Sequence, residues 1–274
     1  MLRLLNIELH KFRYNNAAKA ITIAYFVLIC FIVLLSLIEV FGVKLADQGI
    51  FNFPYIWHVN TWVAAALKIF LAIIIVSMMA NEYSYRTLKQ NLIDGLSKKE
   101  FVISKFLMVL ILSFISTFFV FGVSLILGLS YSDFTEPSII FSDLEYLFAY
   151  FLKLVTFFSF CLFLGVWVKR SAFALGFLFI WFIFEKIIYG VLKWGLFRGS
   201  EIADKIIQFF PLEAMSNLIV EPISRIGVIK SAASQLGEAF TITYEVPWSA
   251  AIICVIWTFL FVYFSYLLLK KRDL

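Results

Sequence analysis

The sequence predicts an all-α integral membrane protein with six transmembrane helices. Hydrophobic residues make up 63% of the 274 residues, aromatic residues make up 19%, and the mean hydropathy is +0.96. This is more apolar surface than the core of a soluble protein can hide. Six apolar runs are long enough to cross about 30 Å of hydrocarbon, which takes roughly 20 helical residues. None alternates apolar and polar residues as barrel strands do, so we expect helices.

The six expected spans leave too little contiguous polar sequence for a soluble domain, so we expect one transmembrane domain over residues 1–274. The spans cover residues 17–42, 61–81, 103–130, 144–168, 172–193 and 248–269. All prolines fall outside them: Pro54, Pro137, Pro211, Pro222 and Pro247. Uninterrupted helices of this kind disfavour a secondary transporter, whose binding site is built from broken helices at the midplane.

Basic residues near the span ends set the expected orientation, because lysine and arginine favour the cytoplasmic side. One side carries Arg3, Lys11, Arg13, Lys19, Arg86, Lys89, Lys98, Lys99, Lys105, Lys169, Arg170, Lys270, Lys271 and Arg272. The short connections opposite, residues 43–60 and 131–143, carry only Lys44. We therefore expect both termini in the cytoplasm. The net charge of +5 reflects this topology, so we expect no nucleic-acid partner.

The first 16 residues have the pattern of an uncleaved helix lying in the membrane interface, in contact with lipid. Leu2, Leu5, Leu9 and Phe12 recur at helical spacing, opposite polar and basic residues. No small-residue cleavage site of a signal peptide follows. The alternative is a merely basic leader to the first span.

The sequence contains no constellation of an enzyme or metal site. The only histidines are His10 and His58, and neither belongs to an H-E-x-x-H motif; no G-x-S-x-G occurs either. Cys30, Cys161 and Cys254 each fall inside an expected span, without the spacing of metal ligands or a disulfide framework. We expect no catalytic residue and no metal.

A polar island, "NEYSYRTLKQNLIDGLSKKEF" at residues 81–101, separates the second and third spans. Its first part has apolar residues at helical spacing, and Glu82 and Arg86 lie one turn apart, so the second span is expected to continue as a cytoplasmic helix. Asp94 and Gly95 end that helix. Ser97 and Glu100 then form a capping-box pattern that starts the next one. The island is therefore predicted to be a compact helix, turn and helix.

The stretch "NEYSYRTLKQNLIDGLSKKEFVISKF" resembles the cytoplasmic loop of ABC-2 type permeases. The matching positions are Glu82, Thr87, Leu88, Leu92, Ser97 and Lys105. Family loops often have glycine before the threonine and proline before the serine, where this chain has Arg86 and Leu96. The layout is similar too: an amphipathic leader, six spans, a very short "KRS" turn between spans four and five, and a long apolar external segment.

The resemblance implies the transmembrane half of a bacterial ABC transporter, located in the cytoplasmic membrane and paired with a second permease subunit, identical or related. Residues 82–100 would be the coupling element that docks on a separate ATP-binding subunit. Its expected site residues are Glu82, Arg86, Thr87, Leu88, Leu92, Gly95, Leu96, Ser97 and Glu100, with the three leucines as apolar anchors. No G-x-x-x-x-G-K-[ST] occurs in this chain, so ATP and Mg²⁺ would bind the partner. The alternatives are a polar connector that only caps two spans, and a channel or assembly scaffold without ATP coupling.

Four charged residues fall inside the expected spans: Lys68, Lys153, Glu185 and Lys186. A helical rise of 1.5 Å per residue places Lys68, Lys153 and Glu185 each about 20 Å from the cytoplasmic ends of their spans, and therefore at similar depth. Such residues are costly and often functional. Glu185 is expected to pair with Lys153 or Lys68. The alternatives are lysines that reach the outer interface and a path for an anionic substrate.

The external segment, residues 194–247, contains "EIADKIIQFFPLEAMSNLIVEPI", which is too apolar for an exposed loop and too short to span twice. We expect short helices that dip into the membrane, and the family resemblance implies the same. "FTITYEV" at residues 240–246 alternates like a strand.

Overall fold

The computed structural model describes residues 2–37, 39–40, 43–44, 49–134, 136–198, 201–225 and 244–272. The main helices of its candidate spans are α2 (Asn16–Cys30), α3 (Tyr55–Ala66), α4 (Lys68–Ser84), α6 (Lys98–Tyr131), α8 (Glu145–Val168), α9 (Ser171–Gly190) and α13 (Trp248–Lys270). The other helices are α1 (Leu2–Tyr14), α5 (Thr87–Ile93), α7 (Pro137–Ile140), α10 (Ile202–Ile207) and α11 (Pro211–Asn217). A 3-10 turn (Phe31–Leu37) extends α2, a π-helical turn (Val191–Leu196) extends α9, and a second 3-10 turn covers Ile223–Arg225.

The predicted all-α membrane fold is confirmed. In the part of the chain that the structure describes, five helices are long and apolar enough to cross a membrane, and the bent pair α3 and α4, taken together, is the candidate for a sixth span. Within the described residues, strand pairing is limited to the antiparallel pair β1 (Glu39–Val40) and β2 (Val43–Lys44).

The second span differs from the prediction. It begins at Tyr55 rather than near residue 61, and it bends by 44° at Leu67, between α3 and α4. The expectation of uninterrupted helices is therefore wrong for this span. Neither proline nor glycine stands at the break, which falls in the run Ala64 to Lys68. Without these usual causes of a sharp kink, the bend had no local signal in the sequence.

Helix α8 forms the centre of the bundle and packs against α3, α4, α6, α9 and α13. Among the five single-helix spans, the one that contains α8 is the most deeply buried. Gly165 allows α8 to approach α4 closely, because a Cβ at this position would lie 2.8 Å from the Cβ of Met79. Small residues have this role at many helix contacts in membranes.

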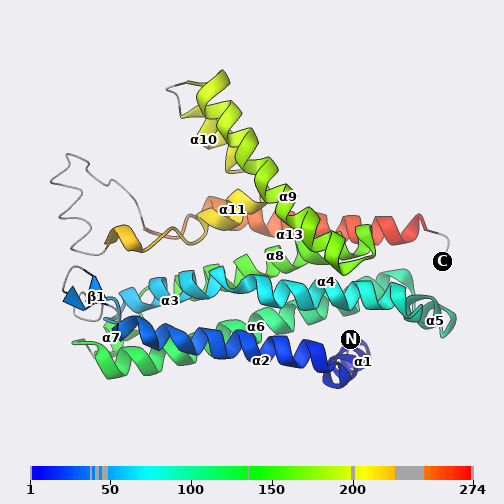
Figure 1. Ribbon diagram of the computed structural model, residues 1–274, viewed down its shortest axis with the longest axis horizontal. Coiled ribbons are helices and arrows are strands. Elements are labelled where there is room, and N and C mark those ends of the chain that lie inside the picture. The colour runs from blue at the N-terminus through cyan, green and yellow to red at the C-terminus, as the bar shows by residue number, and fades with distance from the viewer. Residues whose placement is uncertain are drawn as a thin grey trace.

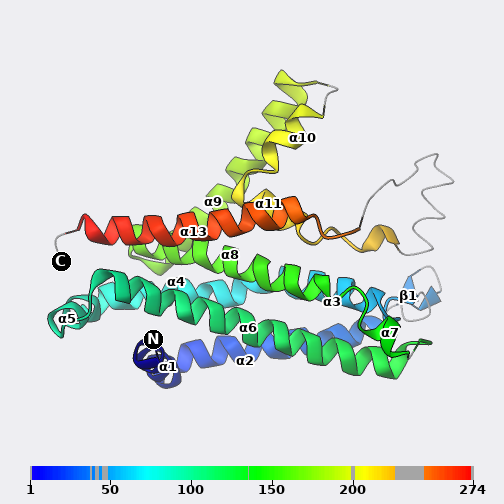
Figure 2. The same cartoon turned by 180° about the vertical axis from the view of Figure 1, so that it is seen from behind.

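Both chain ends and α5 lie at one end of the bundle, whereas β1, α7 and the start of α3 lie at the other (Figures 1 and 2). The basic segments that set the expected orientation therefore gather at one end. We call it the basic end. Helix α9 leaves the bundle at an angle, with α10 near its far end (Figure 1).

Candidate functional site

The polar island folds into the predicted helix, turn and helix, with one difference. Helix α4 ends at Ser84, and Arg86 takes a left-handed conformation with φ 55° before α5 starts at Thr87. The second span is thus not continuous with α5. Gly95, with φ 95°, closes the turn after α5, as its freedom at positive φ permits.

The capping box at the start of α6 is present as predicted. Ser97 Oγ accepts a hydrogen bond from the Glu100 backbone N–H at 3.2 Å. The Glu100 carboxylate accepts from the Ser97 backbone N–H at 2.9 Å. These reciprocal bonds satisfy two donors at a helix end, so the turn between α5 and α6 has a defined geometry.

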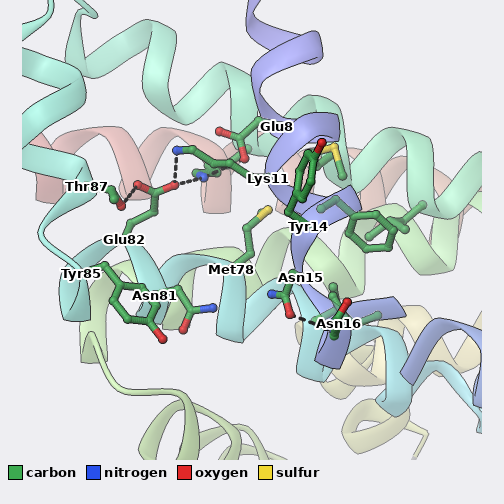
Figure 3. Close-up of a pocket in the computed structure, with 16 residues that line it drawn as sticks. Glu8, Lys11, Tyr14, Asn15, Asn16, Met78, Asn81, Glu82, Tyr85 and Thr87 are labelled. Atoms are coloured by element: carbon green, nitrogen blue, oxygen red, sulfur yellow. Dashed lines mark hydrogen bonds and ion pairs between the residues drawn. The ribbon is translucent and has the colours of Figure 1, made fainter. Parts of the chain in front are cut away.

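The Glu82 carboxylate joins four helices at the basic end (Figure 3). Oε1 accepts from Lys105 of α6 at 2.5 Å and from Lys11 of α1 at 2.7 Å. Oε2 accepts from the Thr87 hydroxyl at 2.6 Å and from the Asn91 amide at 3.4 Å, both in α5. Movement of α5 would therefore act directly on a group that also holds α1, α4 and α6.

Lys105 lies between two buried carboxylates, because its Nζ is also 2.7 Å from Glu8 Oε2 of α1. Lys105 is only 1% exposed, and Glu8 and Glu82 are each 3% exposed. Buried charges are tolerated when they are paired and hydrogen-bonded in this way, and each becomes costly once its partner is removed. We refer to Glu8, Lys11, Glu82 and Lys105 as the charge network.

The contacts of Glu8 and Lys11 within the charge network were not part of the sequence interpretation, in which Lys11 served only to set the orientation and Glu8 had no role. Lys11 and Glu8 bond to residues 71 and 97 positions away. Arg86, which the sequence interpretation places one helical turn from Glu82, forms no ion pair within the described residues and is exposed. Helix α4 ends at Ser84 and the left-handed turn at Arg86 changes the chain direction. Glu82 and Arg86 are therefore not one turn apart on a single helix.

The N-terminal helix is present, but the face that packs on the bundle differs from the predicted apolar stripe. Leu4 and Glu8, one turn apart, are buried. Leu9, which belongs to the predicted stripe, is 40% exposed. The acidic Glu8 on the inward face is explained by its bond to Lys105. The position of α1 in the membrane interface stays a prediction.

The three predicted leucine anchors pack on the chain itself. Leu88 is 3% exposed within the core, and Leu92 and Leu96 are half-buried against the same core. The expectation that Leu88 contacts another subunit is therefore wrong for this conformation. Tyr85 and Ile93, each 75% exposed, are the large apolar side chains that the island presents outward.

A cavity of about 430 Å³ lies beside the charge network, between α1, α2, α4 and α6. Figure 3 shows Lys11 and Glu82 on one side of it and Asn15, Met78 and Asn81 around the rest. The cavity leaves α1 incompletely packed against α4. The charge network thus supplies much of the connection between these helices.

The intramembrane carboxylate Glu185 does not pair with Lys153 or Lys68, so that prediction is wrong. It accepts hydrogen bonds from the Trp181 indole N–H at 2.7 Å and from the backbone N–H groups of Leu212 and Glu213 at 3.2 and 3.1 Å. Leu212 and Glu213 lie in the first turn of α11. Glu185 of α9 therefore caps α11, whose own N-cap residue supplies no side-chain bond.

The three intramembrane lysines have different surroundings. Lys186 pairs with Glu213 at 2.7 Å. Lys68 Nζ donates to the Ala65 carbonyl at 3.1 Å and lies 5.0 Å from the centroid of the Phe157 ring. Lys153, only 6% exposed, forms no hydrogen bond or ion pair with the residues that the structure describes.

The external segment contains the expected short helices, α10 and α11, before the last span. Further along, the Arg225 guanidinium lies between the rings of Tyr55 and Tyr244, 5.0 and 4.9 Å from their centroids. Most of the predicted strand at residues 240–246 falls outside the described residues.

Comparison with known proteins places these features in a family. A family model described as "ABC-2 family transporter protein" matches residues 4–185. The match includes the whole charge network and α5. A search of curated proteins found no match. Since the family model covers more than half of the 274 residues, this multi-pass membrane protein belongs to the ABC-2 transporter family.

Proposed function

We propose that this chain is the permease subunit of a bacterial ABC transporter, in which a separate ATP-binding subunit drives substrate movement, in the direction of export, across the cytoplasmic membrane. The observation that carries the proposal is the Glu82 carboxylate, which bonds to α1, α5 and α6 from its own position on α4. Membership of the ABC-2 family supports the permease role.

The proposed docking surface consists of Tyr85, Lys89 and Ile93, which are exposed on the polar island. A partner that pushes on this surface moves α5, and Thr87 and Asn91 pass the displacement to Glu82. From there it reaches α1 and α6 through Lys11 and Lys105. A hydrogen-bonded pair of helices transmits such a displacement, whereas a disordered loop would absorb it.

ATP and Mg²⁺ would be bound by the partner, because this sequence has no Walker A motif to cradle the phosphates. The transporter would contain two ATP-binding subunits and two permease subunits, since each chain provides one coupling element. The second permease subunit is either a copy of this chain or a related one.

The docking surface is tested by replacing Ile93 with aspartate. A charge in the centre of an apolar contact should reduce recovery of the ATP-binding subunit at least about tenfold, because central apolar contacts dominate binding. Phe141→Asp is the matched control: Phe141 is 55% exposed and follows α7, at the other end of the bundle. Tagged variants are purified from native membranes, and mass spectrometry quantifies any copurified subunit with a Walker A motif.

The control variant should recover as much ATP-binding subunit as the wild-type chain. If Ile93→Asp also does so, the docking surface is wrong. If no ATP-binding subunit accompanies the wild-type chain, a channel or scaffold becomes the better explanation.

A further inference from the structure

A second cavity, of about 270 Å³, lies inside the membrane-spanning region, between α4, α8, α9 and α11. Lys68, Lys153, Phe157, Phe179, Phe182 and Glu185 are among the residues that line it. One wall of the cavity belongs to α9, the helix that leaves the bundle at an angle in Figure 1. Phe179 and Phe182 are 62% and 47% exposed, so the wall formed by α9 is open to the surroundings.

The charges around this cavity do not cancel. Glu185 already accepts hydrogen bonds from the Trp181 indole and two backbone N–H groups. Glu213 is paired with Lys186. Lys68 and Lys153 remain without a carboxylate partner in the described part of the chain. Lys153 is the stronger indication, because it is buried, lines the cavity and has no hydrogen bond.

The break in the second span lies beside the cavity. Helix α4 begins at Lys68, and Ala66, Lys68 and Ile69 line the cavity at this break. The partial positive charge at the N-terminus of α4 is offset there by the C-terminus of α3, which ends at Ala66. Among the described residues, Lys68 and Lys153 therefore supply the unpaired positive charge of the cavity.

A structural role alone does not explain Lys153. An unpaired ammonium in hydrocarbon destabilises the folded protein, and methionine would fill similar space without that cost. Snorkelling does not explain it either, because a snorkelling ammonium reaches the water at the membrane surface, whereas the Lys153 side chain is only 6% exposed and lines the cavity. An anion in the cavity would supply the missing partner.

We infer that Lys68 and Lys153 bind the anionic head, a carboxylate or phosphate, of an amphiphile whose apolar chain lies along Phe179 and Phe182 of α9. A cavity of about 270 Å³ has room for such a head but not for an entire lipid. The amphiphile would be a substrate of the permease, so its transport rests on the proposed function, whereas its binding does not.

Binding is measured with the full chain in phosphatidylcholine nanodiscs, without an ATP-binding subunit. The probe is 11-(dansylamino)undecanoic acid, whose fluorescence reports binding, and its methyl ester is the uncharged comparison. Lys153→Met should weaken binding of the acid at least about tenfold, since bonds to charged groups are stronger than neutral ones. Lys68→Met should also weaken binding of the acid.

Lys186→Met combined with Glu213→Gln is the matched control, because Lys186 lines the same cavity but already pairs with Glu213, and removing both charges leaves no unpaired carboxylate. It should bind the acid within about twofold of the wild-type chain, as an already paired charge offers the ligand little. The ester should bind weakly to every variant. Inorganic phosphate should not displace the acid. Displacement would show that the cavity binds a soluble anion and would overturn the proposal that its ligand is an amphiphile.

Thermal unfolding separates loss of binding from loss of folding. Lys153→Met should be at least as stable as the wild-type chain, since it removes an unpaired buried charge. Wild-type affinity in both Lys153→Met and Lys68→Met, or equal affinity for acid and ester, would show that the cavity is not the proposed binding site for an anionic head. Neither outcome would affect the association test with Ile93→Asp, so the two proposals fail separately.

Discussion

Replacing Lys105 with methionine is expected to destabilise the protein by about 3–5 kcal/mol, the usual cost of removing one partner from a buried ion pair. Lys105 is 1% exposed and bonds to both Glu8 and Glu82. The variant would leave two buried carboxylates with less compensation. The expected result is a large fall in the thermal unfolding temperature of the chain in nanodiscs.

Lys11→Met is the matched control for this variant. Lys11 bonds to the same oxygen of Glu82 but its side chain is 36% exposed, so its loss should cost no more than about 1 kcal/mol. Adding Glu82→Gln to Lys105→Met should recover part of the loss, because it removes one of the uncompensated charges. Equal losses for Lys11→Met and Lys105→Met would contradict the buried role of Lys105.

Replacing Glu185 with alanine is expected to destabilise the protein by about 1–3 kcal/mol, because it leaves three half-buried donors without an acceptor. The Trp181 indole and the first turn of α11 would lose their shared acceptor. Helix α11 should then open more readily than the bundle, which amide hydrogen exchange at Leu212 and Glu213 would detect.

A double-mutant cycle with Lys153→Met separates this capping role from the ion pair expected from the sequence. The two changes should be additive within about 0.5 kcal/mol, as is usual for residues that do not contact each other. A larger coupling energy between Glu185 and Lys153 would support the ion pair expected from the sequence and contradict the capping role.

The features that the sequence predicted correctly are encoded locally. The apolar runs set the spans, and Gly95, Ser97 and Glu100 set the turn and the start of α6, because capping involves residues only three positions apart. Lys68, Lys153 and Glu185 were placed at similar depth, and all three line one cavity.

The features that were missed depend on residues far apart in the chain. Glu8 meets Lys105 across 97 positions, and a single sequence contains no signal for that contact. Leu88, Leu92 and Leu96 are apolar by residue type, but the sequence does not say whether they pack on this chain or on another. Pro211 was a usable signal, because proline favours the first position of a helix and so marked a helix start in need of an acceptor.

The rate of ATP hydrolysis by the copurified ATP-binding subunit tests most directly whether α5 couples this permease to that subunit. That subunit is reconstituted in nanodiscs with the wild-type chain, with Thr87→Val, or alone. Valine removes the hydroxyl that donates to Glu82 at 2.6 Å but keeps a similar shape.

We predict that the wild-type chain raises hydrolysis. Thr87→Val should assemble normally yet reduce this stimulation at least about 10-fold, which corresponds to a bond to a charged group worth about 1.5–3 kcal/mol. Equal hydrolysis with and without the chain, or full stimulation by Thr87→Val, would contradict coupling through α5 and Glu82.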